Sequence, residues 1–488
     1  MLRRGWAWLT RMRTAIVLLL VLAAGAAVGS FFPQRPIDQR AVEAWIDAHP
    51  GWVPFMRAFG IFDVYGSWWF MAIYGLLLVS LVGCLTRRYK MQMRAVRSEP
   101  MHPATLSNRE RYVRARTATT PEEAADRAEA LLRKRRFRIS RDGTSIAGER
   151  GHLRESGSLL FHTSILGVLA GVTIARLFGA TGQVLLVEGD TFLDSYVNYD
   201  TITEGRLFRD DHTGFEITLH DFTVEWHPSG IPRSYVSDVT VTDSSGTTTQ
   251  QQVRVNEPIK IDGRDVYQIA WGWAPVLEVR QGDALLYEGP TVFLPDGGGW
   301  TGVAKIPQST PQQTGLAMQL FVDPFEDEDG VLRDRNRAPR DPVIVAQVLV
   351  GDLRLDRAQN VYTLDPVGLT RVGQEIVGRG RQVELDNGLT VRFRDLVQYS
   401  VFQIGYNPGI KILLGGGIGL LIGLFPALYA FRRRVWIRAT PDEDGTSIEF
   451  AGHAFQRKIG ADEEFAAIVA ELGAALSTPT THDRSAAR

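Results

Sequence analysis

Residues 158–178 read SLLFHTSILGVLAGVTIARLF, an apolar run of 21 residues with His162 near its start. A membrane-spanning helix needs about 20 predominantly apolar residues, so this run is long enough to cross a bilayer. An ionisable side chain inside a span is costly unless it is paired or binds something, which makes His162 a candidate functional residue. Histidine is a common axial ligand of haem iron. The structural alternative is a hydrogen bond to a neighbouring helix.

Three further stretches are long and apolar enough to span a membrane, residues 14–32, 66–85 and 410–431. With residues 157–178 they predict four transmembrane helices. The basic residues before the first stretch are typical of a secretory signal, but no small-x-small cleavage site followed by soluble sequence appears. We therefore expect residues 14–32 to be a retained anchor.

Positive charge flanking the spans predicts their orientation, because Lys and Arg near span ends stay in the cytoplasm. Arginines precede the first span, and basic runs follow the second and the fourth. Residues 87–154 carry 18 Lys and Arg against 8 Asp and Glu, whereas residues 179–409 carry 19 against 33. We expect both termini and the basic segment inside the cell, and the acidic segment outside.

The fold class that follows is an integral membrane protein with four transmembrane helices, a large β-rich extracytoplasmic domain and a small cytoplasmic α+β layer. Alternating or β-branched runs separated by turn residues predict strands throughout residues 179–409. A sheet sandwich or barrel-like domain is the natural class. The acidic, Arg-rich residues 326–340 are expected to form an exposed loop.

Two short cytoplasmic pieces have similar patterns. The first has a helical pattern at residues 122–134 and strands near 137–140 and 145–147. The second has strands near residues 435–439 and 447–450 and a helix near 462–472. Each is too small to bury a good core alone, so we expect the two to pack together. Residues 478–488 are polar and are expected to be disordered.

These expectations divide the chain into nine consecutive segments. They are the cytoplasmic N-terminus 1–13, span 14–32, extracytoplasmic loop 33–65, span 66–85, basic cytoplasmic segment 86–156, span 157–178, extracytoplasmic domain 179–409, span 410–431 and cytoplasmic tail 432–488. The predicted location is the cell membrane, with the bilayer as a partner and no nucleic acid.

Several chemistries lack the residues they need. Cys84 is the single cysteine, which excludes a disulfide, a Cys-x-x-Cys redox pair and a covalent c-type haem on this chain. No Gly-x-x-x-x-Gly-Lys-Ser/Thr loop occurs, which argues against an ATP motor. His212, His220 and His227 are spaced too widely to indicate a metal site, and we expect ordinary surface histidines.

Other conspicuous residues have structural interpretations. Cys84 at a helix end is expected to be a small packing residue, and Trp68 and Trp69 to belong to an interfacial aromatic belt. The arginine runs are expected to set topology before they contact haem propionates or lipids. Gly415–417 and Gly419 are expected to let another helix approach closely, such as a partner's.

Blocks of residues spread over nearly the whole chain resemble the ResB/CcsB family of System II cytochrome c biogenesis. The order of parts matches too, with three spans, a large outer domain, a fourth span and an inner tail. The matching blocks are GSFFPQ at 29–34, WWF at 68–70, Gly83, Cys84, Arg88, GSLLFH at 157–162, GIPRSYVSD at 230–238, VNEP at 255–258, YQ at 267–268, NPG at 407–409 and RRVW at 433–436.

The resemblance implies a role in moving haem from the cytoplasm to the outer face, where it is attached to apocytochrome c. It implies a ResC/CcsA-type membrane partner, and a haem b that is bound transiently and shared with that partner. In the family the histidine of the third span is a proposed axial ligand, which here is His162. The tryptophan-rich motif of the partner family is absent from this chain, so thioether formation is not expected of this chain alone. The resemblance implies that the chain is a subunit of a cytochrome c synthase complex.

Two alternatives remain open. In one, the chain is a membrane-anchored assembly scaffold without haem, and His162 bonds to another helix. In the other, it is a proton-coupled transporter subunit in which His162 relays protons. Four spans leave little room for such a pathway, and no second ionisable residue occurs at mid-membrane depth in the sequence.

Overall fold

The computed structural model describes residues 2–151, 153–209, 212–229, 231–296, 299–356, 359–443, 445–455 and 460–477. Gly230 of the GIPRSYVSD block and the tail predicted to be disordered, residues 478–488, lie outside them. The chain divides into two compact units, one made of Met1–Val172 with Ile410–Arg488 and the other of Thr173–Gly409. The first unit contains long helices and a small mixed domain, and the second is built mainly of strands.

Four helices among the described residues are long and apolar enough to cross a membrane. They are α2 (Met12–Phe31), α5 (Trp68–Arg97), α7 (Leu153–Phe178) and α8 (Ile410–Tyr429). The predicted spans fall on these helices, although α5 continues about three turns beyond residue 85. Most of their surface is exposed and apolar, as lipid contact requires, so the chain is a multi-pass membrane protein.

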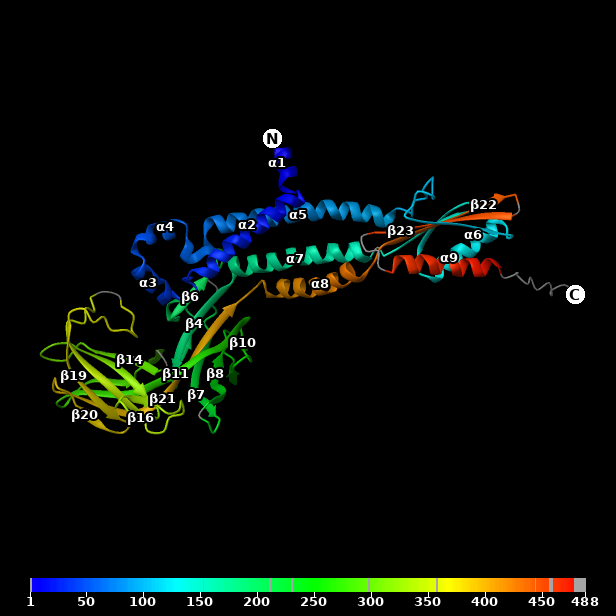
Figure 1. Ribbon diagram of the computed structural model, residues 1–488. Helices are drawn as coiled ribbons and strands as arrows, with labels where there is room; N and C mark the ends of the chain where they lie inside the picture. The colour runs from blue at the N-terminus through cyan, green and yellow to red at the C-terminus, as the bar shows by residue number, and fades with distance from the viewer. Residues whose placement is uncertain are drawn as a thin grey trace. The chain divides into compact units, whose positions relative to one another are not determined.

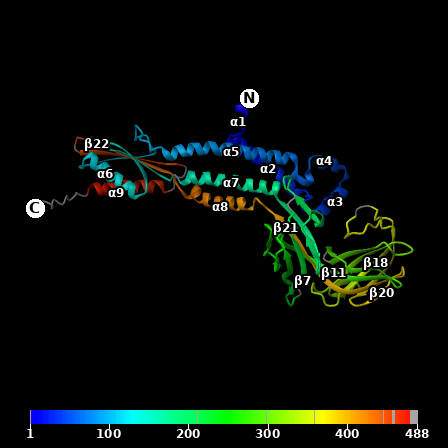
Figure 2. The same ribbon diagram turned by 180° about the vertical axis from the view of Figure 1, so that it is seen from behind.

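In the first unit, α2 lies beside α5 and α7 lies beside α8 (Figures 1 and 2). Gly25 of α2 lies so close to α5 that an added Cβ would come 2.9 Å from the Trp69 ring. The hydroxyl of Tyr74 on α5 donates to the carbonyl oxygen of Leu169 on α7, at 2.6 Å. A short helix, α1 (Leu2–Leu9), precedes α2.

The segment between α2 and α5 folds into a small helical cap rather than an open loop. It contains α3 (Gln39–Ala48), η1 (Pro50–Trp52), α4 (Val53–Ala58) and η2 (Ile61–Gly66), around a core of Val42, Met56, Ile61 and Phe62. The buried Gln34 amide closes the cap. Its Nε2 donates to the Ile61 carbonyl oxygen at 2.9 Å, and its Oε1 accepts from the Val64 amide at 3.0 Å.

The two small pieces predicted to pack together form one antiparallel five-stranded sheet, in the order β1-β23-β22-β3-β2. Their joint packing is therefore confirmed. The strands are β1 (Arg111–Thr117), β2 (Arg138–Asp142), β3 (Ser145–Arg150), β22 (Arg433–Asp442) and β23 (Gly445–Ala454). Strand β1 was not predicted, because three of its seven residues are arginines and its middle residues 113–116 are all exposed.

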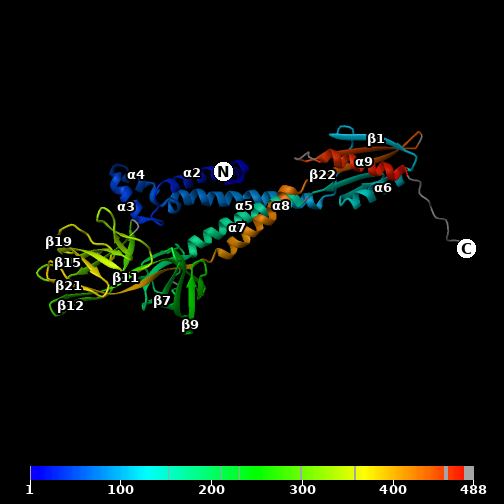
Figure 3. The ribbon, with the colours of Figure 1, turned by 60° about the horizontal axis from the view of Figure 1, so that its bottom comes forward.

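Both helices of this domain cover one face of the sheet (Figure 3). They are α6 (Pro121–Lys134) and α9 (Ala461–Ser477). Ala128 and Leu132 of α6 and Ile468 and Leu472 of α9 share one buried cluster with sheet residues such as Ile437. The opposite face is covered near Trp436 by Leu106, from the segment that follows α5. Neither piece could bury this core without the other.

The second unit is all β among the described residues apart from one 3-10 turn (Tyr196–Asn198) and the end of α7. A 12-stranded antiparallel sheet runs in the order β19-β18-β15-β14-β13-β11-β21-β4-β6, with β10, β12 and β20 pairing beside it. Its strands are β4 (Ala180–Val187), β6 (Thr201–Glu204), β10 (Ile259–Ile261), β11 (Arg264–Gln281), β12 (Ala284–Pro290), β13 (Phe293–Asp296), β14 (Gly299–Ile306), β15 (Thr314–Phe321), β18 (Val343–Gly351), β19 (Leu369–Gly378), β20 (Gln382–Glu384) and β21 (Leu389–Tyr406).

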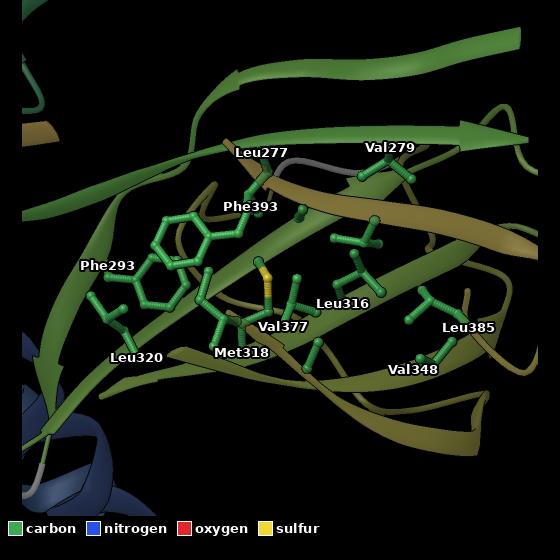
Figure 4. Close-up of a cluster of buried hydrophobic side chains, with 14 of the residues drawn as sticks. Leu277, Val279, Phe293, Leu316, Met318, Leu320, Val348, Val377, Leu385 and Phe393 are labelled. Atoms are coloured by element: carbon green, nitrogen blue, oxygen red, sulfur yellow. The ribbon is translucent and has the colours of Figure 1, made fainter. Parts of the chain in front are cut away.

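A second sheet of four strands, β5-β7-β8-β9, packs on part of the first. Its strands are β5 (Thr191–Leu193), β7 (Glu216–Trp226), β8 (Pro232–Thr242) and β9 (Thr248–Arg254). One core lies between the sheets, around Phe215 and Phe402. A separate core fills the curved part of the large sheet, where Phe293, Phe393 and Met318 converge (Figure 4).

The prediction of an exposed loop at residues 326–340 was partly wrong. A two-stranded hairpin, β16 (Pro324–Glu326) with β17 (Leu332–Asp334), occupies its first half. Asp327 stabilises the turn, since its carboxylate accepts from the Val331 amide at 2.8 Å and pairs with Arg333 at 2.5 Å. Charged residues thus form the hairpin that composition alone assigned to a loop.

Candidate functional site

His162 lies in the first half of α7, about 14 Å along the helix axis from Leu153 at a rise of 1.5 Å per residue. The helix forms because residues 157–178 are apolar, with Glu155 in the first turn and Arg176 in the last. The ring is half-buried and packs edge-on against Phe161, with centroids 5.5 Å apart. The structure therefore places His162 within a membrane helix, as the sequence predicts.

The ring lies on the side of α7 that faces away from α8. Gly157 and Ser164 are buried, and both lie against α8. At 100° per residue, His162 lies roughly opposite this side. His162 is thus not a hydrogen-bonding link between α7 and α8.

A single hydrogen bond orients the imidazole. Its Nδ1 lies 2.7 Å from the backbone carbonyl oxygen of Ser158, one turn earlier. A carbonyl oxygen can only accept, so Nδ1 carries the proton and Nε2 of the neutral ring holds a lone pair. Among the described residues Nε2 has no hydrogen-bond partner. Metal-binding histidines use this arrangement, with one ring N–H donating to a carbonyl and the other nitrogen free to ligate.

Close packing of α8 on α7 supports the backbone beside His162. A Cβ added at Gly423 would lie 2.6 Å from the Phe161 amide nitrogen, and one at Gly416 would lie 2.9 Å from the Val168 nitrogen. Gly415 and Gly417 have no atom within 4 Å of a built Cβ. The expectation that Gly415–417 and Gly419 admit another helix therefore holds for Gly416 and Gly419, and the helix they admit is α7 of the same chain. Gly423, which the sequence did not single out, packs against α7 in the same way.

Arginines after α8 pair with two carboxylates, one in β3 and one in the first turn of α7. Arg432 contacts both Glu149 of β3 and Glu155 of α7, the latter at 2.5 Å, and Arg434 lies 3.0 Å from Glu149. Burial alone would raise the pKa of Glu149, but the hydrogen bonds from Arg432 and Arg434 outweigh burial and lower it. These arginines therefore stabilise the junction between α7, α8 and the five-stranded sheet.

The three histidines of the second unit do not converge. His220 bonds to Thr240 at 2.6 Å and His227 to Ser229 at 2.8 Å, both near the surface. His212 differs from the expected surface histidine, since its side chain is only 11% exposed. No group of three possible metal ligands occurs among the residues that the structure describes.

His212 belongs to a buried polar cluster that sequence reasoning missed. Its Nδ1 lies 2.9 Å from Asp194 and its Nε2 lies 3.1 Å from Glu204. The fully buried Asp194 carboxylate also accepts from the Tyr199 hydroxyl and the Thr213 amide, both at 2.8 Å. Residues 194, 204 and 212 follow no motif spacing, and only the fold brings them together.

Cys84 and the tryptophans at the start of α5 have packing roles. The Cys84 thiol donates to the Thr10 carbonyl oxygen at 2.9 Å, as expected of a packing residue. Trp68 is exposed, while the Trp69 indole donates to the Phe59 carbonyl oxygen at 2.8 Å. These positions suit aromatic side chains at a membrane surface.

Comparison with known proteins identifies the relatives of this chain. Residues 12–466 match the model of the ResB-like family. The chain belongs to this family. A protein of Gloeobacter violaceus named cytochrome c biogenesis protein CcsB is 25% identical over 97% of this chain and 91% of its own length. Proteins of the same name from Synechococcus elongatus and Synechococcus sp. are 24% and 26% identical, over 97% and 85% of this chain and 94% and 87% of their own lengths.

Several residue blocks that resemble the ResB/CcsB pattern have structural roles here. Gln34 closes the helical cap. Ser237 of the GIPRSYVSD block bonds to Ser400 at 3.1 Å and to Gln268 at 3.4 Å, in the interior of the second unit. Asn407 accepts from the Gly409 amide at 3.1 Å and shapes the turn into α8. These residues stabilise the fold, whereas the GSLLFH block contains His162, whose Nε2 has no hydrogen-bond partner among the described residues.

Proposed function

We propose that this chain is a membrane component of cytochrome c maturation that acts with a ResC/CcsA-type protein to transfer haem across the membrane for attachment to apocytochrome c. Membership of the ResB-like family supports this role, as do full-length relatives named cytochrome c biogenesis protein CcsB. The observation that carries the haem part of the proposal is the geometry of His162: Nδ1 is held by Ser158, while Nε2 has no hydrogen-bond partner in the part of the chain that the structure describes.

In this proposal haem is the cargo and His162 is one axial ligand. Haem b presents an iron with two axial positions, which neutral imidazole nitrogens can occupy. The Ser158 carbonyl holds the ring in the ligating tautomer. Because His162 faces away from α8, the haem face of α7 is also the face on which the partner would supply the second ligand. Close α7–α8 packing keeps the histidine backbone rigid beneath it.

The proposed orientation puts both termini and the five-stranded sheet in the cytoplasm and the strand-rich unit outside. Its support is the basic charge flanking α2 and α5 and the acidic charge of residues 179–409. His162 would then lie nearer the cytoplasmic surface, where haem arrives.

In a Cys84→Ser background, an impermeant thiol reagent added to intact cells should label Ser245→Cys and spare Glu463→Cys. The reverse labelling would refute this orientation.

The decisive test of function is the visible spectrum of the complex purified with its membrane partner, comparing wild type with His162→Ala. Loss of an axial ligand weakens haem retention, so the variant should lose most of its haem absorbance and most cytochrome c maturation in cells. Added imidazole should restore both, since it supplies the missing nitrogen.

A matched control is His220→Ala, which removes an imidazole that only bonds to Thr240. It should leave the spectrum and maturation unchanged. Unaltered haem in His162→Ala with maturation lost would favour the assembly scaffold, because the chain would then be required without binding haem. Unaltered haem with normal maturation would assign both ligands to the partner.

A further inference from the structure

The helical cap between α2 and α5 carries an exposed aromatic face. Trp52, Phe55 and Phe59 are spaced three and four residues apart, so they share one side of the η1–α4 turn. All three are about half exposed or more, at 61%, 53% and 49%. Phe55 and Phe59 also contact each other, with ring centroids 4.7 Å apart. Large apolar side chains that cluster on one exposed side indicate a surface that contacts lipid or another protein.

Contacts with α5 fix the level of this face along the membrane spans. The indole of Trp69, the second residue of α5, donates to the carbonyl oxygen of Phe59 at 2.8 Å. Phe59 therefore lies at the level where α5 begins, and α4 lies near this end of α5 (Figure 1). Trp68 is itself 76% exposed at this level.

The opposite membrane surface can be placed from the other end of α5. Ser80 and Cys84 donate to the carbonyl oxygens of Leu9 and Thr10, at the junction of α1 and α2. Arg87 and Arg88 follow directly on α5, so this level is a charged membrane surface. Trp69 precedes Arg88 by 19 residues, or about 28 Å of helix, which is close to the thickness of the hydrocarbon core. The level of Phe59 and Trp69 is therefore the second membrane surface.

We propose that α4 lies in the membrane–water interface at the end where α5 begins, with Trp52, Phe55 and Phe59 inserted among lipid headgroups and upper acyl chains. Aromatic rings prefer this zone. The only charged residue of α4 is Arg57, which is exposed and can pair with lipid phosphate. A phospholipid surface thus fits both the apolar face and the charge. The cap is then a lipid anchor that holds the α2–α5 hairpin at a fixed depth.

This anchor is independent of haem binding and goes beyond the proposed function. The Gln34 bonds and the small core of Val42 and Met56 make the cap rigid, so lipid contact at α4 also restrains α2 and α5. The buried side of α4, at Met56, faces the cap core, which leaves its aromatic side for the bilayer.

Labelled variants in phospholipid nanodiscs test the anchor. In a Cys84→Ser background, which keeps a donor for Thr10, an environment-sensitive fluorophore is attached at Phe55→Cys or at Glu43→Cys. Glu43 is an exposed residue of α3 in the same cap and serves as the matched control. The label at position 55 should emit at shorter wavelength, be quenched strongly by doxyl groups near the lipid headgroup, and be quenched several-fold less by aqueous iodide than the label at position 43.

Equal iodide quenching at both positions would overturn the proposal, because the face would then lie in water. Shielding from iodide without doxyl quenching would overturn it too, since a protein would then cover the face. If the unlabelled Phe55→Cys protein has the same melting temperature as its Cys84→Ser parent, either outcome reports the location of α4 and not a misfolded cap.

Discussion

His162 and His212 show how hydrogen bonding separates a candidate ligand from a structural histidine. Each ring has Nδ1 bonded to an oxygen, Ser158 O in one and Asp194 in the other. The second nitrogen of His212 also lies within hydrogen-bond distance of a carboxylate, that of Glu204, at 3.1 Å. Of these two rings, only His162 has a nitrogen without a hydrogen-bond partner among the described residues, and metal ligation requires such a nitrogen.

Asp194 provides a prediction about stability. Burial alone would raise the pKa of this carboxyl, but hydrogen bonds from His212 and Tyr199 outweigh burial and the pKa is lowered. Asp194→Asn places an amide group against donors and removes the charge, which should destabilise the second unit by about 1–3 kcal/mol. Thermal unfolding at neutral pH measures this loss.

The pH dependence has a definite sign. Because the folded pKa of Asp194 lies below its unfolded value, its ionised form stabilises the fold above about pH 4, and this contribution disappears as pH falls through the folded pKa. Wild type should therefore lose more stability than Asp194→Asn between neutral and acidic pH. Asp283→Asn, at an exposed position of the same unit, should follow wild type. Parallel pH profiles for Asp194→Asn and wild type would contradict the prediction.

The packing of α8 against α7 depends on glycines that lie on one side of α8, the side that faces α7. A methyl group at Gly423 would lie 2.6 Å from the Phe161 nitrogen and 2.9 Å from the Gly157 carbonyl oxygen, both backbone atoms that cannot rotate away. Gly423→Ala should therefore separate the helices and cost about 1–3 kcal/mol. It should also alter the haem spectrum of the complex, because Phe161 precedes His162.

Gly417→Ala is the matched control on the same helix. A Cβ there meets no atom within 4 Å, so this variant should keep or slightly raise the melting temperature in detergent. If Gly423→Ala melted no lower than Gly417→Ala, close packing at Gly423 would not stabilise the helix pair.

The molecule consists of two compact units joined through α7 and α8. In the first, β22 lies at the centre of a sheet whose other strands include β1 and β3, from a segment some 300 residues earlier. Ile437 in β22 is 1% exposed, so Ile437→Asp buries an unpaired charge and should unfold this domain, at a cost of about 3 kcal/mol or more.

Limited proteolysis of the variant in nanodiscs should give early cuts in residues 99–150 and 433–477 and leave residues 180–406 resistant. Thr440→Asp, at an exposed position of the same strand, should give the wild-type pattern. Simultaneous digestion of both units in Ile437→Asp would mean that they unfold together.

Local sequence patterns were sufficient to predict the membrane-spanning helices and to single out His162. The spans could be predicted because about 20 apolar residues in sequence are both the signal and the structure. His162 stood out because an imidazole in such a run is rare. The hairpin at residues 324–334 and strand β1 were not predicted, because both are rich in charged residues and neither shows the sustained alternation of apolar and polar residues that indicates a strand.

The amino-acid order by itself determined the membrane spans, the strand-rich character of residues 179–409 and the singular position of His162, since each depends on residues close together in the chain. Tertiary structure alone decided that α8 packs on the side of α7 away from His162, that α4 presents an aromatic face, and that Asp194, Glu204 and His212 meet. These features join residues far apart in sequence, and their contacts depend on how strands pair and helices cross, which no local pattern records.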